Sequence, residues 1–152
     1  MPMIIHIGSL KLNIRKCTDN DYQFCYNISK RNMSPYINKH WGGWKPKMFN
    51  KYFNKGNIRI VEYRNRRIGL YAFEFKKDHS YINSIQISRQ FRKKGLGTLL
   101  MNLMEKESKE RKLSKIQLGI FKENPAIKLY ERLGYKKIKD CSSSIIMEKK
   151  IA

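Results

Sequence analysis

The sequence predicts an α+β protein in which helices pack on a mixed sheet. Short runs alternate apolar and polar residues as strands do, and longer segments between them repeat apolar residues at helical spacing. The segments follow the order β-α-α-β-β-β-α-β-α-β-β, which places a layer of helices on one sheet. With 152 residues, 41% of them hydrophobic, the chain is expected to form a single domain over residues 1–152 with its own core.

The first part of the chain is predicted to form two strands and then a helix. Residues 4–12 are typical of a hairpin around a Gly-Ser turn, and residues 12–17 alternate like a strand. Thr18 is placed to cap a helix whose apolar spacing extends to about Asn32. Pro35 is expected to end this helix, because the residue before a proline disfavours helical backbone.

Two further helices are marked by their apolar faces. A short helix follows Pro46, and its Phe49 and Phe53 are expected to pack against another helix. A longer helix over residues 96–111 has an apolar face, and Glu105 is assigned to its opposite, polar face. Strands are expected over residues 58–63, 68–75, 81–88, 115–121, 135–138 and 144–148, and a last helix between Asn124-Pro125 and Gly134.

The segment Arg-Lys-Lys-Gly-Leu-Gly at residues 92–97 follows a strand and opens a helix. Its two glycines allow a tight turn and the close approach of a ligand. The helix directs unpaired N–H groups and a partial positive charge into the turn. Four basic residues lie within six positions of Gly95, so this turn is suited to a phosphate or pyrophosphate. Its spacing matches neither the Rossmann fingerprint nor a Walker loop.

The composition narrows the classes of partner. Lys and Arg number 33 against 12 Asp and Glu, a formal charge of +21, which favours anionic partners such as nucleic acid or a phosphorylated cofactor. Three cysteines without Cys-x-x-Cys spacing indicate a reducing compartment, taken as the cytoplasm. The scattered histidines predict no metal site. No apolar run approaches the ~20 residues that a membrane helix needs.

Two motifs resemble those of the GNAT superfamily of N-acetyltransferases. Residues 92–97 match its acyl-CoA loop, Arg/Gln-x-x-Gly-x-Gly/Ala. Farther along, residues 124–135 resemble its Asn-x-x-Ala-x-x-Leu-Tyr-x-x-x-Gly-Phe/Tyr segment. The order of elements is also that of the superfamily, and the resemblance extends from Leu12 to the C-terminus. It implies a GNAT-like mixed, mostly antiparallel central sheet of about seven strands flanked by about four helices.

The resemblance implies direct transfer of an acetyl group from acetyl-CoA to a primary amine of a small molecule or protein. Backbone groups of Ile85 and Ile87 would pair with the pantetheine arm, and an N–H near Ile87 would polarise the thioester carbonyl. Asn124 would bond the cofactor arm, and Tyr130 would protonate the leaving thiolate. The implied cofactor-binding residues are Ile85, Ile87, Arg92, Lys93, Lys94, Gly95, Leu96, Gly97, Thr98, Asn124, Ala126 and Tyr130.

The sequence identifies the general base less clearly than the cofactor-binding residues. An alkyl amine of pKa ~10.4 must lose a proton before it attacks, so a base or a water chain is needed. Many members of the superfamily have a glutamate on the strand before the loop, where this chain has Tyr81. Glu74 on the preceding strand is the best remaining carboxylate, and Glu62 is a weaker one. In the alternative, both carboxylates face solvent and a chain of water molecules removes the proton from the amine.

The acceptor is expected to be bound by residues 22–61, as in the superfamily. This segment has eight Lys or Arg and no Asp or Glu, so a polyamine or a lysine-rich tail is disfavoured. Tyr36, Trp41 and Trp44 are expected to line the acceptor cleft, or else to pack between helices. The rival function is a basic nucleic-acid- or ribosome-associated binding module on the same fold. The sequence leaves open a monomer or a homodimer.

Overall fold

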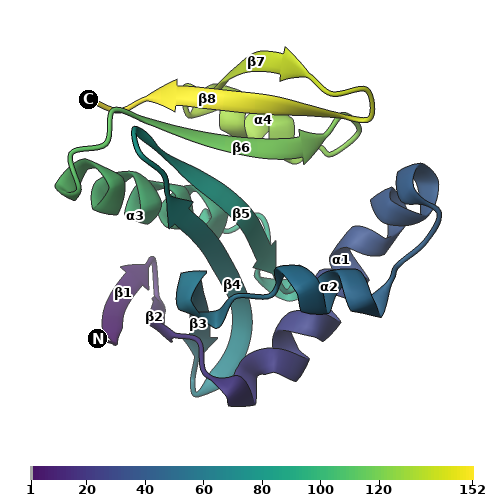
Figure 1. Cartoon of the computed structure of the whole chain (residues 1–152). Coiled ribbons are helices and arrows are strands. Elements are labelled where there is room, and N and C mark those ends of the chain that lie inside the picture. The colour runs from purple at the N-terminus through teal and green to yellow at the C-terminus, as the bar shows by residue number, and fades with distance from the viewer. Residues whose placement is uncertain (1) are drawn as a thin grey trace. The chain divides into compact units, whose positions relative to one another are not determined.

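The computed structural model describes residues 2–152 (Figure 1). Its hydrogen-bonded strand order is β1-β2-β3-β4-β5-β6-β8-β7, in which β5 and β6 are parallel. The strands are β1 (Met3–Ile7), β2 (Leu10–Lys16), β3 (Ile58–Tyr63), β4 (Arg66–Phe75), β5 (His79–Ile87), β6 (Lys115–Phe121), β7 (Lys136–Asp140) and β8 (Ser144–Lys150). The α-helices are α1 (Tyr22–Trp41), α2 (Pro46–Tyr52), α3 (Leu96–Glu110) and α4 (Ala126–Arg132), and three short 3-10 helices are η1 (Asp19–Asp21), η2 (Lys55–Asn57) and η3 (Arg89–Phe91).

The predicted fold class is confirmed, with one more strand than expected. The described residues form a mixed, mostly antiparallel sheet of eight strands with four α-helices. The additional strand is β1, which the Gly8-Ser9 turn pairs with β2. Gly8 adopts a positive φ of 56°, which suits a tight turn. The sheet was underestimated because the hairpin and the strand after it were counted once.

The chain divides into two compact units. The first consists of Met1–Ala72 and Ser84–Leu96, and the second of Phe73–Asn83 and Gly97–Ala152. Strands β4 and β5 each contribute residues to both units. The expectation of a single domain over residues 1–152 stays a prediction.

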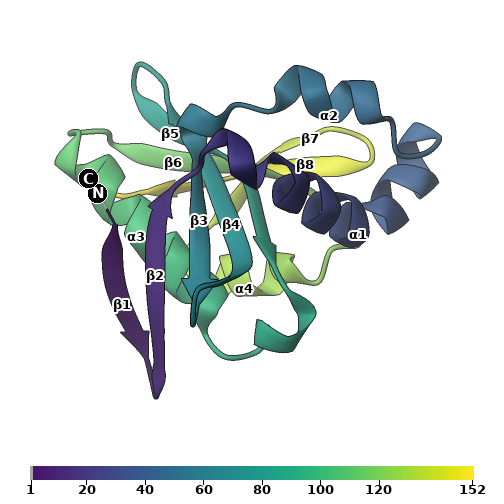
Figure 2. The same cartoon turned by 90° about the horizontal axis from the view of Figure 1, so that it is seen from below.

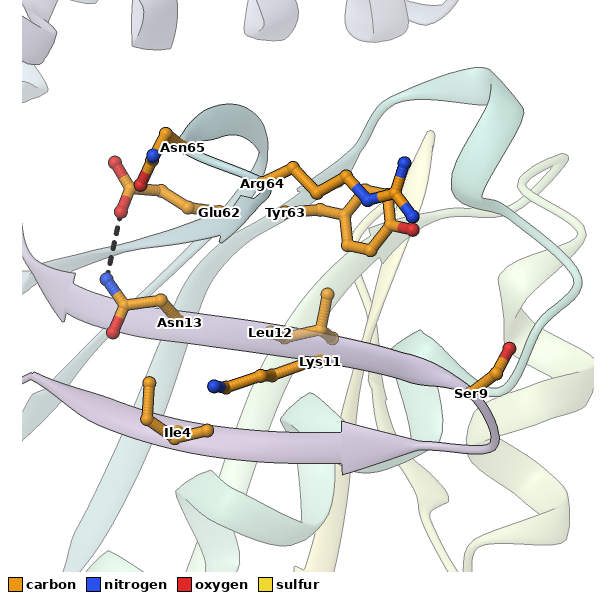
Figure 3. Close-up of a pocket in the computed structure, with 9 residues that line it drawn as sticks. All are labelled: Ile4, Ser9, Lys11, Leu12, Asn13, Glu62, Tyr63, Arg64 and Asn65. Atoms are coloured by element: carbon orange, nitrogen blue, oxygen red, sulfur yellow. Dashed lines mark hydrogen bonds between the residues drawn. The ribbon is translucent and has the colours of Figure 1, made fainter.

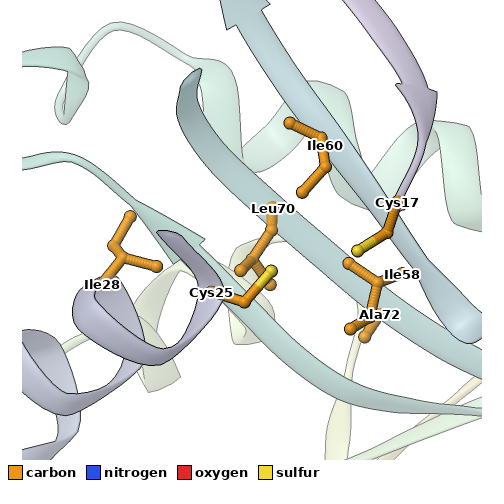
Figure 4. Close-up of a cluster of buried hydrophobic side chains, with 7 residues drawn as sticks. All are labelled: Cys17, Cys25, Ile28, Ile58, Ile60, Leu70 and Ala72. Atoms are coloured by element: carbon orange, nitrogen blue, oxygen red, sulfur yellow. The ribbon is translucent and has the colours of Figure 1, made fainter. Parts of the chain in front are cut away.

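The core of the first unit lies between α1 and the strands beneath it. Figure 4 shows Cys25 and Ile28 of α1 close to side chains of β3 and β4. Burying these apolar groups removes them from water, which holds α1 on the sheet. Phe24, Phe49 and Phe53 pack against the same cluster. The buried members are Cys17, Cys25, Ile28, Ile58, Ile60, Leu70 and Ala72.

Helix α1 continues past the proline that was expected to end it. Pro35 lies inside the helix, which extends to Trp41. A proline lacks the N–H that would bond one turn back, so it weakens the helix locally without stopping it here. The helix ends at Gly42, which adopts a left-handed φ of 76° and donates its N–H to the carbonyl of Ile37.

An aromatic cluster joins α2 to α1, and the two helices lie near each other in Figures 1 and 2. The ring of Phe49 lies 5.7 Å from Tyr22 and 5.2 Å from Tyr26. Phe53 lies 5.0 Å from Tyr22 in an edge-on arrangement. The expectation that Phe49 and Phe53 pack against a helix is confirmed. Such edge-on pairs stabilise beyond the area they bury, by about 0.5–1.5 kcal/mol each.

In the second unit, α3 packs against β5 and the C-terminal strands. The hydroxyls of Ser80 and Ser108 lie 2.5 Å apart in a buried contact between β5 and α3. The assignment of Glu105 to the polar face of α3 was wrong, since this residue is only 6% exposed. Its carboxylate accepts hydrogen bonds from the Tyr135 hydroxyl at 3.0 Å and the Lys149 ammonium at 2.9 Å. These partners make burial of the charge tolerable.

Candidate functional site

The basic loop at residues 92–97 connects η3 to the first turn of α3. Lys93 and Gly95 adopt positive φ values of 60° and 84°, so the backbone reverses direction within the loop. Arg92, Lys93 and Lys94 are exposed, whereas Leu96 is buried at 4% exposure and anchors the start of α3. The exposed basic loop and the N–H groups at the start of the helix are suited to an anion.

The last part of β5 presents backbone groups away from β4. The Ser88 N–H donates to the Ile68 carbonyl of β4 at 2.8 Å. Because successive residues of a strand alternate in direction, the N–H and carbonyl groups of Ile85 and Ile87 point to the opposite side. The parallel ladder between β5 and β6 contains four residue pairs and ends at Ile82, before these positions. This backbone edge is suited to an extended ligand.

A polar network that the sequence analysis missed fastens α1 to this region of β5. Asn32 of α1 donates to the Gln86 side chain at 3.0 Å and lies within 3.5 Å of the Ile87 carbonyl. Arg92 donates to the same carbonyl at 3.1 Å and to the Asn32 amide oxygen at 2.7 Å. Asn32 stands 54 positions before Gln86, so no local pattern in the sequence marks the pair.

In the second unit, the start of α3 meets α4. A Cβ added at Gly97 would lie 3.3 Å from the Leu129 side chain, so glycine permits this close approach. The Asn124 side chain accepts a hydrogen bond from the Ala126 N–H at 2.9 Å. This bond closes a turn that leads into α4, which accounts structurally for an asparagine at this position. Thr98 follows in the first turn of α3 and is half-buried.

Tyr130 of α4 is half-buried. Its ring lies 6.1 Å from that of Tyr135 at an interplanar angle of 58°. Burial raises the pKa of Tyr130 to about 12, because the phenolate would lose its hydration. The hydroxyl therefore keeps its proton at neutral pH and can act as a donor.

Glu74 of β4 is engaged by neighbours within the second unit. It pairs with Lys76 and accepts a hydrogen bond from the Asn83 amide at 3.1 Å. The Lys76 contact holds the pKa of Glu74 below its ordinary value. The carboxylate is thus ionised at neutral pH and can accept a proton, but with reduced basicity.

The three aromatic residues assigned to the acceptor lie on α1 and in the segment after it. Tyr36 is half-buried within the second half of α1, and Trp41 is 56% exposed at its end. Trp44 donates its indole N–H to the Tyr26 hydroxyl at 3.0 Å, and its ring lies 5.6 Å from that of Tyr26. This contact fixes Trp44 in the aromatic cluster between α1 and α2.

An open pocket of about 410 Å³ lies elsewhere in the first unit, along β2 and the turn between β3 and β4 (Figure 3). Asn13 and Glu62 are joined across it by a hydrogen bond of 2.9 Å. Of the residues considered for cofactor, catalysis or acceptor, Glu62, the weaker candidate base, lines this pocket, and the others do not. The lining residues are Ile4, Ser9, Lys11, Leu12, Asn13, Glu62, Tyr63, Arg64 and Asn65.

Residues 2–152 contain neither a cluster of metal-binding side chains nor a helix that could cross a membrane. No group of three or more His, Cys, Asp or Glu side chains is arranged to hold a metal ion within that part of the chain. In the same residues, no helix is both long and apolar enough to span a bilayer. The free cysteines are Cys17, Cys25 and Cys141.

The fold is a mixed α+β sheet, and the loop at residues 92–97 is basic and exposed. The model of the acetyltransferase (GNAT) family matches residues 20–135, and the chain belongs to this family. The resemblance seen in the two sequence motifs is thereby confirmed.

Similar proteins agree with this placement. The uncharacterized protein YxbD of Bacillus subtilis (strain 168) is 26% identical over 113 residues, 72% of this chain and 70% of that protein. The PaiA N-acetyltransferase of Thermoplasma acidophilum, solved in complex with coenzyme A, has a TM-score of 0.72 at 16% identity, covering 91% of this chain and 98% of that one. The ribosomal-protein-S18-alanine N-acetyltransferase of Escherichia coli has a TM-score of 0.71 at 19% identity, covering 93% and 94%. At these identities the structural likeness establishes the fold.

Proposed function

We propose that this protein is an acetyl-CoA-dependent N-acetyltransferase that moves an acetyl group directly to a primary amine of a small molecule or protein. The observation that carries the proposal is the basic loop at residues 92–97. In a chain of the GNAT family, its positive-φ turn and the following helix start are suited to the pyrophosphate of coenzyme A. Lys93 and Lys94 add positive charge beside the N–H groups.

Other groups are proposed to bind the rest of the cofactor. The backbone of Ile85 and Ile87 would pair with the pantetheine arm as an added strand would. Because the Ile87 carbonyl already accepts a hydrogen bond from Arg92, the N–H of Ile87 is the group proposed to pair there. The side-chain oxygen of Asn124 already accepts the Ala126 N–H, so its amide N–H is the group proposed to contact the arm. Ala126 leaves room beside it because its side chain is small.

The reaction needs one proton removed and one supplied. Acetyl-CoA supplies the acetyl group as a thioester, so a carbon–sulfur bond breaks and an amide bond forms. We assign Glu74 to accept the amine proton, directly or through water, because it is ionised at neutral pH. We assign Tyr130 to donate a proton to the sulfur, because its hydroxyl is protonated at neutral pH.

The acceptor is proposed to contact Tyr36, Trp41 and Trp44. Trp44 is held by Tyr26 and would serve as a fixed wall, whereas the exposed ring of Trp41 offers apolar surface to a ligand. Because these three side chains are aromatic, we expect the acceptor to have some apolar surface beside its amine.

The proposal is tested by release of coenzyme A from acetyl-CoA over a panel of amines, amino-acid derivatives, peptides and ribosomal proteins. With an accepted amine, Tyr130→Phe is expected to lower kcat by about 10- to 100-fold, because the donor is lost. Affinity for acetyl-CoA should stay nearly unchanged, since the ring is retained. Glu74→Gln is expected to lower kcat at neutral pH, where wild-type Glu74 is ionised.

The outcomes separate the parts of the proposal. Unchanged turnover in Tyr130→Phe would remove Tyr130 as the acid, and unchanged turnover in Glu74→Gln would support a water relay. If calorimetry detects no binding of acetyl-CoA to the folded wild-type chain, the enzymatic proposal is wrong.

A further inference from the structure

Net positive charge is concentrated in the first unit of the chain, because acidic residues are scarce there. This unit contains 18 Lys and Arg against three Asp and Glu, whereas the second contains 15 against nine. All three acids of the first unit are already in ion pairs. Asp21 pairs with Arg15 and Arg67, Glu62 with Arg15, and Asp19 with Lys55. Much of the positive charge of this unit is therefore available to an external anion.

Helix α2 of this unit combines cations with exposed apolar side chains. Lys47 and Lys51 are four residues apart, so they lie on one face of the helix. Met48 and Tyr52 have the same spacing and form the neighbouring row, at 47% and 70% exposure. The Lys51 ammonium lies 5.5 Å from the centre of the Tyr52 ring. The opposite side of α2 is occupied, because Phe49 packs against α1.

We propose that this outer face of α2, defined by Lys47, Met48, Lys51 and Tyr52, binds a single-stranded polynucleotide. This proposal goes beyond acetyl transfer and does not depend on it. A single strand offers a phosphate beside each base, which matches a row of lysines beside an exposed ring. Lys47 and Lys51 contact phosphates, and a base stacks on Tyr52 with Met48 as its apolar neighbour.

The exposed ring distinguishes a single strand from other anions. In a duplex the bases are already stacked inside, so only phosphates would meet α2 and Tyr52 would contribute little. An acidic peptide would use the lysines but has no flat base to place on the ring. Neither a lysine nor a stacked ring recognises the ribose 2′-hydroxyl, so RNA and DNA strands are expected to bind alike.

The test measures fluorescence anisotropy of the full chain with labelled 12-nucleotide oligo(U), oligo(dT) and a 12-base-pair duplex, at 50 to 200 mM salt. Both single strands are expected to bind with affinities that fall as salt rises. Tyr52→Ala is expected to weaken binding of the single strands by about tenfold and to leave the duplex unaffected. Tyr52→Phe should retain the affinity, because the stacking surface remains.

Matched controls separate this face from overall charge. Lys47→Gln with Lys51→Gln should weaken binding of the single strands and flatten its salt dependence. Lys136→Gln with Lys137→Gln removes two exposed cations of β7 in the second unit and should have little effect. Because Tyr52 is 70% exposed, these variants are expected to fold, and circular dichroism verifies it.

Three results would overturn the proposal. One is equal affinity of wild type and Tyr52→Ala for the single strands. Another is an equal loss of affinity in the Lys136→Gln, Lys137→Gln variant and the Lys47→Gln, Lys51→Gln variant, which would indicate binding by net charge alone. The third is equally tight binding of a polyglutamate peptide, which would indicate an acidic-protein partner.

Discussion

At the scale of single residues, Asp21 shows how burial and charge are balanced in this chain. It is 1% exposed, and its carboxylate accepts hydrogen bonds from both terminal nitrogens of Arg15 at 2.8 and 2.9 Å. The backbone N–H of Thr18 adds a third bond at 2.8 Å. The Arg15 hydrogen bonds lower the pKa of Asp21 to about 2, because these partners favour the charged form.

This pKa makes stability depend on pH in a defined direction. The charge of Asp21 stabilises the folded state above the ordinary pKa near 4, and the contribution is lost as pH falls towards 2. Asp21→Asn is expected to cost about 2 kcal/mol of unfolding free energy at pH 7 and much less at pH 2. Urea unfolding at several pH values measures this difference.

The matched control for this prediction is Asp19→Asn. Asp19 is 83% exposed and pairs with Lys55 at the surface. The substitution should therefore lower the free energy of unfolding only slightly at every pH. Equal destabilisation by both substitutions, or a pH-independent loss in Asp21→Asn, would contradict the assigned role of the buried carboxylate.

At the scale of elements, the turn into α3 depends on the backbone conformation of Gly95. Gly95 adopts a φ of 84°, and a Cβ placed there would meet no atom within 4 Å. A side chain at this position would strain the backbone but would have space around it. Such open space is expected where a ligand approaches. Gly8 in the β1–β2 turn has the same combination, with a φ of 56° and open space.

Gly95→Glu is expected to abolish binding of acetyl-CoA, because it adds bulk and negative charge where we place the pyrophosphate. Gly8→Glu imposes comparable backbone strain of about 1–2 kcal/mol and should leave the affinity unchanged. Calorimetric titration with acetyl-CoA compares the two. Retained affinity in Gly95→Glu would remove the pyrophosphate from this loop.

The elements also show where local signals were sufficient. Strands β3 and β6 begin and end at the predicted residues, because their apolar runs are bounded by polar turns. The end of α1 was placed too early. Pro35 gave a strong local stop signal, but the helix continues through it and ends at Trp41, where Gly42 adopts the left-handed conformation.

At the scale of the whole molecule, charge is expected to select among acceptors. The first unit, with 18 cations against three acids, contains the segment proposed to bind the amine. A polyamine should therefore give a lower kcat/KM than a neutral monoamine of similar length. Added salt should reduce this difference in kcat/KM, because it screens the repulsion. Initial rates at 20 and 300 mM salt measure it. A preference for the polyamine at low salt would contradict this expectation.

Sequence patterns were sufficient for the α+β class, the family and the loop at residues 92–97, because periodicity and turn glycines act over a few neighbouring residues. Contacts between distant residues needed the folded chain. Asn32 meets Arg92, 60 positions later, and Glu105 is buried because Tyr135 and Lys149 come to it from other elements. Hydrogen-bond partners and burial are set by which elements pack together, and that packing follows from the sum of many weak contacts rather than from any one segment.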